Sequence, residues 1–213
     1  MASQPLTALD LRAGVNGYTC PGRPALAAEL AWRDATLTDR KTGVYAAMFV
    51  AAALACTPVM NEPLEIFETA LKFIPRKSRF YSITAAALRI VFKSQNWLDA
   101  YGRIHEKYEE YGHCRVFQQT GTLINTLHHA QDVGHGICIQ VCQGNDTDSY
   151  GATAGFLLGA YFSPGHLEER WLKPCNDTIH LAPANFHEQS LSVLSKRMGE
   201  LPSLVDEALK STK

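Results

Sequence analysis

The chain has 213 residues, 46% of them hydrophobic, which is enough for one sizeable buried core and does not require two domains. Twenty basic and twenty-one acidic residues leave a formal charge of −1, which excludes the basic footprint of a nucleic-acid-binding or membrane-surface protein. The longest apolar run, residues 44–56, is too short to span a bilayer, so we expect one domain over residues 1–213 and no membrane segment.

The first half of the chain carries apolar residues at helical spacing. Pro24 opens a run of leucines and alanines that continues to Leu37, as expected of a helix with proline in its first turn. Residues 44–56 are apolar on every side, which indicates a central, buried helix. Residues 64–74 repeat apolar side chains every three or four positions, which predicts an amphipathic helix that ends before Pro75.

The middle of the chain continues in the same way. Helices are predicted over residues 80–90, 97–108 and 119–130, and Asn96 is the expected N-cap of the second. Residues 134–142 are compatible with a helix or with a short buried strand, because periodicity does not separate the two over so short a run.

A pair of helices, over residues 191–198 and 204–209, is expected near the end of the chain. No segment alternates apolar and polar residues with the period of two that marks a half-buried strand. We therefore predict an all-α fold, a compact multi-helix assembly without internal repeats.

Six cysteines are scattered through the chain without paired C-x-x-C knots. This usage, together with a start that lacks a basic and then an apolar signal region, favours reduced thiols in a cytoplasmic protein. Cys138 and Cys142 lie four apart, but no second pair of cysteines or histidines completes a zinc set, so we expect them to be core thiols.

The most distinctive stretch is residues 144–149, with the sequence Gly-Asn-Asp-Thr-Asp-Ser. In a loop, Asp146 and Asp148 would turn their carboxylates toward one point beside the Ser149 hydroxyl, and hard cations such as Mg²⁺ or Ca²⁺ prefer such oxygens. An EF-hand loop is excluded, because its closing position falls on Leu157, which has no carboxylate. On the pattern alone, capping of the following helix by Asp148 or Ser149 is the commoner interpretation.

Three glycines, Gly151, Gly155 and Gly159, follow this stretch at steps of four. Because glycine inside a helix costs about 1 kcal/mol relative to alanine, three on one face indicate that another helix approaches closely there.

Residues 144–161 resemble the G-x-D-T-D-[ST]…GA…G…GA signature of the ADP-ribosylglycohydrolase family. Three further blocks resemble the family and occur in its order between about Leu11 and Met198. They are Pro21-Gly22-Arg23-Pro24 with Ala27-Ala28-Glu29-Leu30-Ala31 and Asp34-Ala35; Gly43-Val44-Tyr45-Ala46-Ala47-Met48-Phe49; and Arg170-Trp171-Leu172 with Asn176-Asp177-Thr178.

The resemblance implies a compact all-α, Mg²⁺-dependent hydrolase that cleaves the glycosidic bond between ADP-ribose and a protein side chain or related acceptor. The expected partner is an ADP-ribosylated protein or an ADP-ribose-like small molecule. In the family the aspartates and hydroxyl of D-x-D-[ST] hold a pair of Mg²⁺ ions, which implies Asp146, Asp148 and Ser149 as metal ligands. Gly43 and Tyr45 are the implied ligand-binding residues, and the alternative for Tyr45 is a core tyrosine with a satisfied hydroxyl. The catalytic residue stays unknown.

Two departures from the family pattern qualify this expectation. The chain contains no Thr-Asp-Asp and no counterpart of the N-terminal segment with a catalytic Glu, so it corresponds to the C-terminal part of the pattern, a partial domain. Asp39 also stands where members carry a histidine thought to face the diphosphate. We therefore expect impaired hydrolysis, and the alternative is a non-catalytic structural or ADP-ribose-binding relative of the family.

Overall fold

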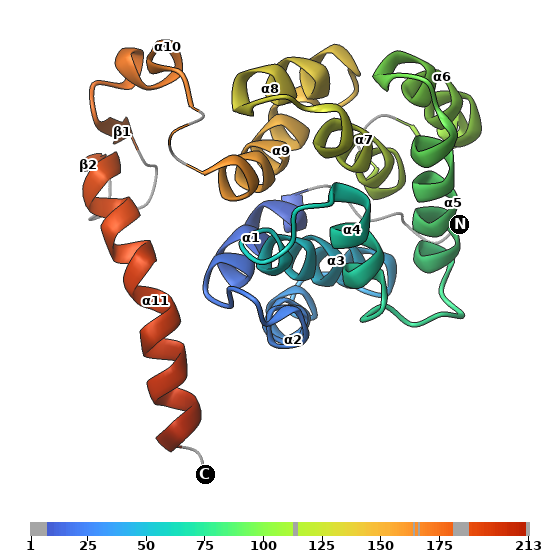
Figure 1. Cartoon of the computed structure of the whole chain (residues 1–213). Helices are drawn as coiled ribbons and strands as arrows, with labels where there is room; N and C mark the ends of the chain where they lie inside the picture. Colours follow the sequence, from blue (N-terminus) through green and yellow to red (C-terminus); the bar gives the residue numbers. More distant parts are fainter. Residues whose placement is uncertain (1–7, 113–114, 164, 166, 181–187, 212–213) are drawn as a thin grey trace.

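The computed structural model describes residues 8–112, 115–163, 165, 167–180 and 188–211, and these are mostly helical, as Figure 1 shows. The predicted all-α fold is confirmed. The helices are α1 (Ala8–Tyr18), α2 (Pro24–Ala35), α3 (Thr42–Cys56), α4 (Pro63–Leu71), α5 (Arg79–Lys93), α6 (Trp97–Tyr108), the 3₁₀ turn η1 (Glu109–Tyr111), α7 (Val116–His129), α8 (Val133–Cys142), α9 (Thr147–Phe162), α10 (Glu169–Leu172), the 3₁₀ turn η3 (Lys173–Cys175) and α11 (Leu191–Ser211).

Helix α3 is the centre of the N-terminal half, as its uniform apolarity predicted. It packs against α1, α2 and α4 and is buried along most of its length. Its alanines allow the neighbouring helices to approach closely, and Phe49 fills the remaining space between the rings of Phe67 and Phe80. The ring centroids of both pairs are 5.7 Å apart.

Helix α7 is the buried helix of the C-terminal half. It lies against α5 and α6 on one side and against α8 and α9 on the other, and every residue from Val116 to Leu127 is buried. Residues 134–142, for which the sequence left a helix and a strand as alternatives, lie in helix α8. Asn96 caps α6 by accepting hydrogen bonds from the backbone N–H groups of Leu98 and Asp99, as predicted.

Polar side chains bridge α7 and α8 inside this buried layer. Asn125 donates to Gln143 Oε1 at 2.8 Å, and Gln143 donates in turn to Thr126 Oγ1 at 2.9 Å. Thr126 donates to Gln140 Oε1, also at 2.9 Å. Because a buried amide without partners is costly, these bonds fix the register of α8 on α7, immediately before the acidic loop.

The prediction of close packing along the glycine face of α9 is wrong for two of its three glycines. A Cβ added to Gly155 or Gly159 meets no heavy atom of the described residues within 4 Å. Close approach occurs instead at Gly17, where an added Cβ would lie 2.6 Å from Leu54 Cβ, and at Gly136, where Leu158 fills the space. Glycine spacing alone does not show which helix face another helix contacts.

The C-terminal region differs from prediction in two details. The expected helix pair is one continuous helix, α11, which contains Pro202 in its interior. Two short strands, β1 (Thr178–His180) and β2 (Glu188–Ser190), pair antiparallel before it, with Ile179 opposite Gln189. Helix α11 stands at one edge of the molecule (Figure 1) and touches α1, with an ion pair between Arg23 and Asp206 nearby.

The cysteine prediction is partly wrong. Cys138 and Cys142 are exposed rather than core thiols, whereas Cys20 and Cys56 are buried, and Cys114 lies outside the described residues. In the described part of the chain no helix combines the length and the apolar character that crossing a membrane requires.

Candidate functional site

The acidic stretch forms a tight left-handed turn between α8 and α9. Gly144 has a φ of 73° and Asn145 a φ of 66°, a region that glycine enters freely and asparagine tolerates better than most residues. The chain then reverses, and α9 begins at Thr147 with Asp146 as its N-cap residue. The Gly-Asn pair therefore leads the chain into α9, whose N-cap is Asp146 and whose first turn carries Asp148 and Ser149.

The side chains of Asp146, Asp148 and Ser149 differ in their exposure to solvent. Asp148 is exposed, and Asp146 and Ser149 are half-buried. Capping by Asp148 or Ser149 is wrong, since the N-cap is Asp146, whose side chain makes no capping hydrogen bond with the first turn.

Two carboxylates and one hydroxyl suit Mg²⁺ in chemistry but fill only part of an octahedral coordination sphere. Among the described residues no group of three or more His, Cys, Asp and Glu side chains gathers as a metal-binding cluster. The three oxygens match the donor type that Mg²⁺ prefers, and the other positions of its coordination sphere would be left to water, to a ligand or to another chain.

Side-chain hydrogen bonds hold the start of α9 against α7. Tyr150 is buried, and its hydroxyl donates to the carbonyl of Arg115 at 2.9 Å and accepts from the N–H of Arg115 at 3.2 Å. Thr153 donates to the Ser149 carbonyl at 3.0 Å and accepts from Gln119 Nε2 at 3.2 Å. Ser149 is therefore positioned by residues that motif reasoning missed, because polar groups in a buried helix carry no sequence signature of their own.

Gly43 and Tyr45 lie in the first turn of α3, where Gly43 is buried and Tyr45 half-buried. Helices α3 and α9 pack against each other, so the two predicted sets belong to neighbouring helices. No hydrogen bond in the described part of the chain joins Gly43 or Tyr45 to Asp148 or Ser149.

The residue that replaces the expected histidine has a basic neighbour. Burial raises the pKa of Asp39 above its usual value, and the charge of Arg12 opposes that rise. Arg12 also pairs with Asp34 at 3.2 Å and donates to Thr38 at 3.1 Å. The charge of a guanidinium therefore acts on Asp39. The sequence did not indicate this neighbour, because Arg12 belongs to α1 and is far from Asp39 along the chain.

The described residues thus form a mostly helical structure in which Asp146, Asp148 and Ser149 lie at the start of α9. The family model for ADP-ribosylglycohydrolase matches residues 11–204, and the chain belongs to this family. Neither curated proteins nor solved structures gave a match.

Proposed function

We propose that the protein is a Mg²⁺-dependent hydrolase that cleaves the glycosidic bond between ADP-ribose and a protein side chain or related acceptor. Membership of the ADP-ribosylglycohydrolase family supports hydrolase chemistry of this type. The observation that carries the proposal is the turn at the start of α9, which presents two carboxylates and a hydroxyl within the family's signature. Asp146, Asp148 and Ser149 are the proposed ligands of Mg²⁺.

Each part of this chain has a defined task in the proposed reaction. Asp146, Asp148 and Ser149 would hold the ion, which when bound would supply Lewis-acid chemistry toward the ribose. Carboxylates near the ribose stabilise the positive charge that develops on the ring as the glycosidic bond breaks. Tyr45 and Gly43, on the neighbouring α3, are proposed to contact the ligand.

The partial set of ligands supports impaired turnover by this chain. Mg²⁺ requires near-octahedral oxygen geometry, and the sequence supplies no Thr-Asp-Asp to complete it. The second candidate is a non-catalytic ADP-ribose-binding relative, which is favoured by the lack of a larger acidic cluster among the described residues.

Calorimetry with ADP-ribose, with and without Mg²⁺, tests the proposed site. We expect the chain to bind ADP-ribose more tightly when Mg²⁺ is present, with an ion affinity of millimolar order because the ligand set is partial. Asp148→Ala should remove the Mg²⁺ dependence, whereas Glu106→Ala, which removes an exposed acid on α6, should leave it unchanged. Binding of ADP-ribose that is indifferent to Mg²⁺ would instead establish the non-catalytic candidate.

Turnover is measured separately, as release of ADP-ribose from an ADP-ribosylated protein in the presence of Mg²⁺. We expect little or none from this chain alone. Vigorous release that Asp146→Ala abolishes would contradict the expected impairment while supporting the assigned ligands.

A further inference from the structure

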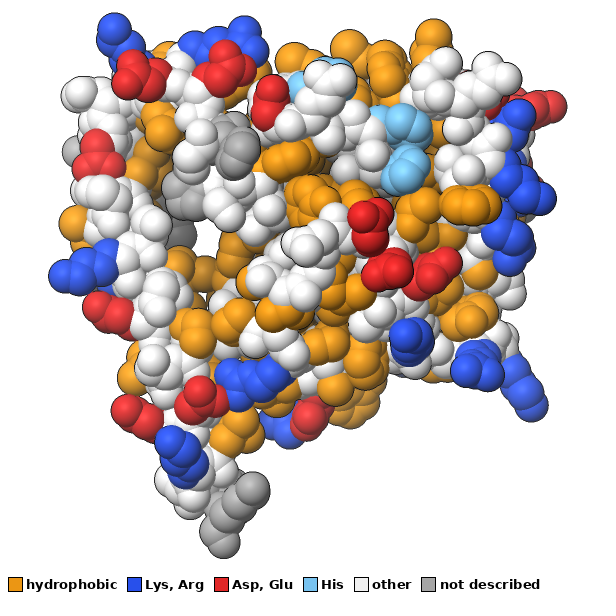
Figure 2. Space-filling view, in the orientation of Figure 1, with side chains coloured by type: hydrophobic (Ala, Val, Ile, Leu, Met, Phe, Trp, Pro, Cys, Tyr) orange, Lys and Arg blue, Asp and Glu red, His pale blue; other side chains and the backbone are white. Residues whose placement is uncertain are grey.

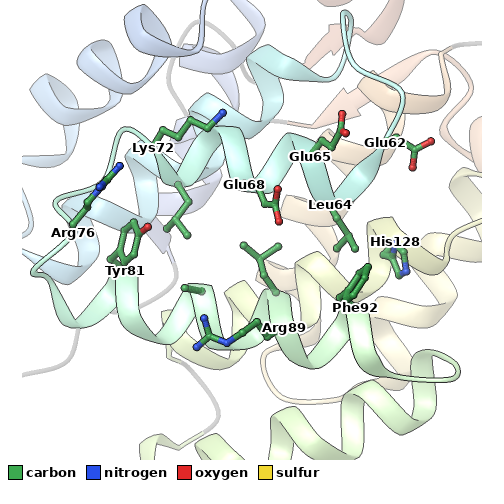
Figure 3. Close-up of a pocket in the computed structure, with 13 residues that line it drawn as sticks. Glu62, Leu64, Glu65, Glu68, Lys72, Arg76, Tyr81, Arg89, Phe92 and His128 are labelled. Atoms are coloured by element: carbon green, nitrogen blue, oxygen red, sulfur yellow. The ribbon is translucent and has the colours of Figure 1, made fainter.

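A groove between α4 and α5 lies apart from the acidic turn, and it has a cavity volume of about 670 Å³. Figure 3 shows its walls, with α4 on one side, α5 on the other and His128 of α7 at one end. Its floor is apolar and includes Leu64 and Leu88, and Phe92 stands at its rim with 73% of its surface exposed. An apolar floor between two antiparallel helices suits a third helix.

The charged side chains of the groove are arranged by sign. Glu62 and Glu65 lie at the end near His128, and Lys72 and Arg76 lie at the other end, as Figure 3 shows. Glu68 and Arg89 stand between the two ends. Within the described residues, none of these six side chains forms an ion pair. The groove therefore offers uncompensated charge of both signs, ordered along its length.

The outer face of α11 has a matching pattern. Steps of three and four residues place six exposed side chains on this face, and successive positions at such steps share one side of a helix. They are Val193, Lys196, Arg197, Glu200, Leu204 and Glu207. The face is basic toward its N-terminal end, acidic at Glu200 and Glu207, and apolar at Val193 and Leu204, which are 51% and 55% exposed.

The two surfaces also agree in length. From Val193 to Glu207 the helix rises about 21 Å, and the fifteen-residue α5 is about 22 Å long at 1.5 Å per residue. The inner face of α11, with Leu194 and Met198 half-buried, is directed elsewhere. Docking of the outer face therefore does not require α11 to leave the body of its own chain.

We propose that the groove between α4 and α5 binds the outer face of α11 from a second copy of this chain. Lys196 would lie over the end that carries Glu62 and Glu65, Glu200 beside Arg89 at the centre, and Glu207 over the end that carries Lys72 and Arg76. Val193 and Leu204 would cover the apolar floor. The order of the charges along the two surfaces identifies the occupant.

The arrangement of the molecule makes this contact intermolecular. In Figure 1 α11 lies at one edge, and α4 and α5 lie across the body from it, so α11 does not reach its own groove. Figure 2 shows acidic, basic and apolar side chains gathered on the face over α4 and α5. A two-fold axis between two copies would place each α11 on the partner's groove and close the assembly as a dimer.

Charge reversal tests the proposal through the oligomeric state of the full chain. Sedimentation of the wild type is expected to show a dimer at roughly micromolar concentrations. Glu65→Lys with Glu68→Lys, and separately Lys196→Glu, should each weaken the dimer about tenfold or more by setting like charges against each other. Glu109→Lys with Glu110→Lys makes the same charge change as the first variant, but on η1 and outside the groove, and should leave the dimer intact.

Mixing the two reversed variants provides the decisive measurement. In the mixed dimer the reversed groove meets the reversed α11, and the native groove meets the native α11, so both contacts are attractive. We expect each variant alone to be monomeric and the mixture to form dimers, with the helical circular dichroism unchanged throughout. A monomeric wild type, a dimer indifferent to the groove reversal, or a mixture that stays monomeric would each overturn the proposal.

Discussion

Replacing Gly17 by alanine is expected to lower the free energy of unfolding by about 1–3 kcal/mol, the usual cost of overpacking a close contact. The new Cβ would lie 2.6 Å from Leu54 Cβ, an atom fixed to the backbone of α3. A flexible side-chain end could turn aside, but a Cβ moves only with its helix. Helices α1 and α3 must therefore separate, which loosens the centre of the N-terminal half.

The same substitution at Gly102 is the matched control, because this glycine is also inside a helix, α6, and an added Cβ meets nothing within 4 Å. Alanine there should raise the free energy of unfolding by about 0.5–1 kcal/mol, through its better helix propensity. Urea unfolding followed by circular dichroism measures both variants. Effects of the same sign would show that helix propensity, and not the contact with Leu54, decides the result at Gly17.

Apolar spacing was sufficient to predict most of the fold. The run from Val44 to Cys56 has no polar face, so only a position surrounded by other helices can bury all of its sides. Helix α3 occupies such a position. Prolines and capping residues located several boundaries, because they act within one turn of the residue that carries them. Asn96 at the start of α6 is an example.

Features that depend on contacts between distant segments could not be predicted in this way. The position of Gly155 on α9 does not show which helix face meets a neighbour. In the structure, a Cβ added at Gly155 meets no heavy atom of the described residues within 4 Å. Arg12 comes near Asp39 only because α1 and α2 fold together. The groove between α4 and α5 has no motif, since its charges belong to two helices that each look ordinary alone.

The residues of the candidate site also differ in whether a local pattern or a contact between helices identifies them. Asp146, Asp148 and Ser149 are predicted as site residues because a local motif contains all three, and they lie at the start of α9. Gln119 and Thr153, which fix Ser149, were missed, because a buried hydrogen bond between α7 and α9 is invisible along the chain.

The second large effect is expected at Gln143, the residue that joins the buried polar layer to the acidic turn. Gln143→Leu should lower the free energy of unfolding by about 1–3 kcal/mol, because Asn125 and Thr126 each lose one buried hydrogen bond that water cannot replace. The change removes the acceptor of Asn125 at 2.8 Å and the donor to Thr126 at 2.9 Å. Gln131→Leu, the same change at an exposed position, should stay within about 0.5 kcal/mol of the wild type.

The double variant Asn125→Leu with Gln143→Leu distinguishes two causes of the lower stability, the loss of hydrogen bonds and the loss of side-chain packing. If unpaired polar groups cause the loss, the double variant should cost less than the sum of the single ones, since both partners are then apolar. Strict additivity in urea unfolding would assign the loss to packing instead. Because Gln143 directly precedes Gly144, Gln143→Leu should also weaken Mg²⁺-dependent binding of ADP-ribose, a loss that Gln131→Leu should not share.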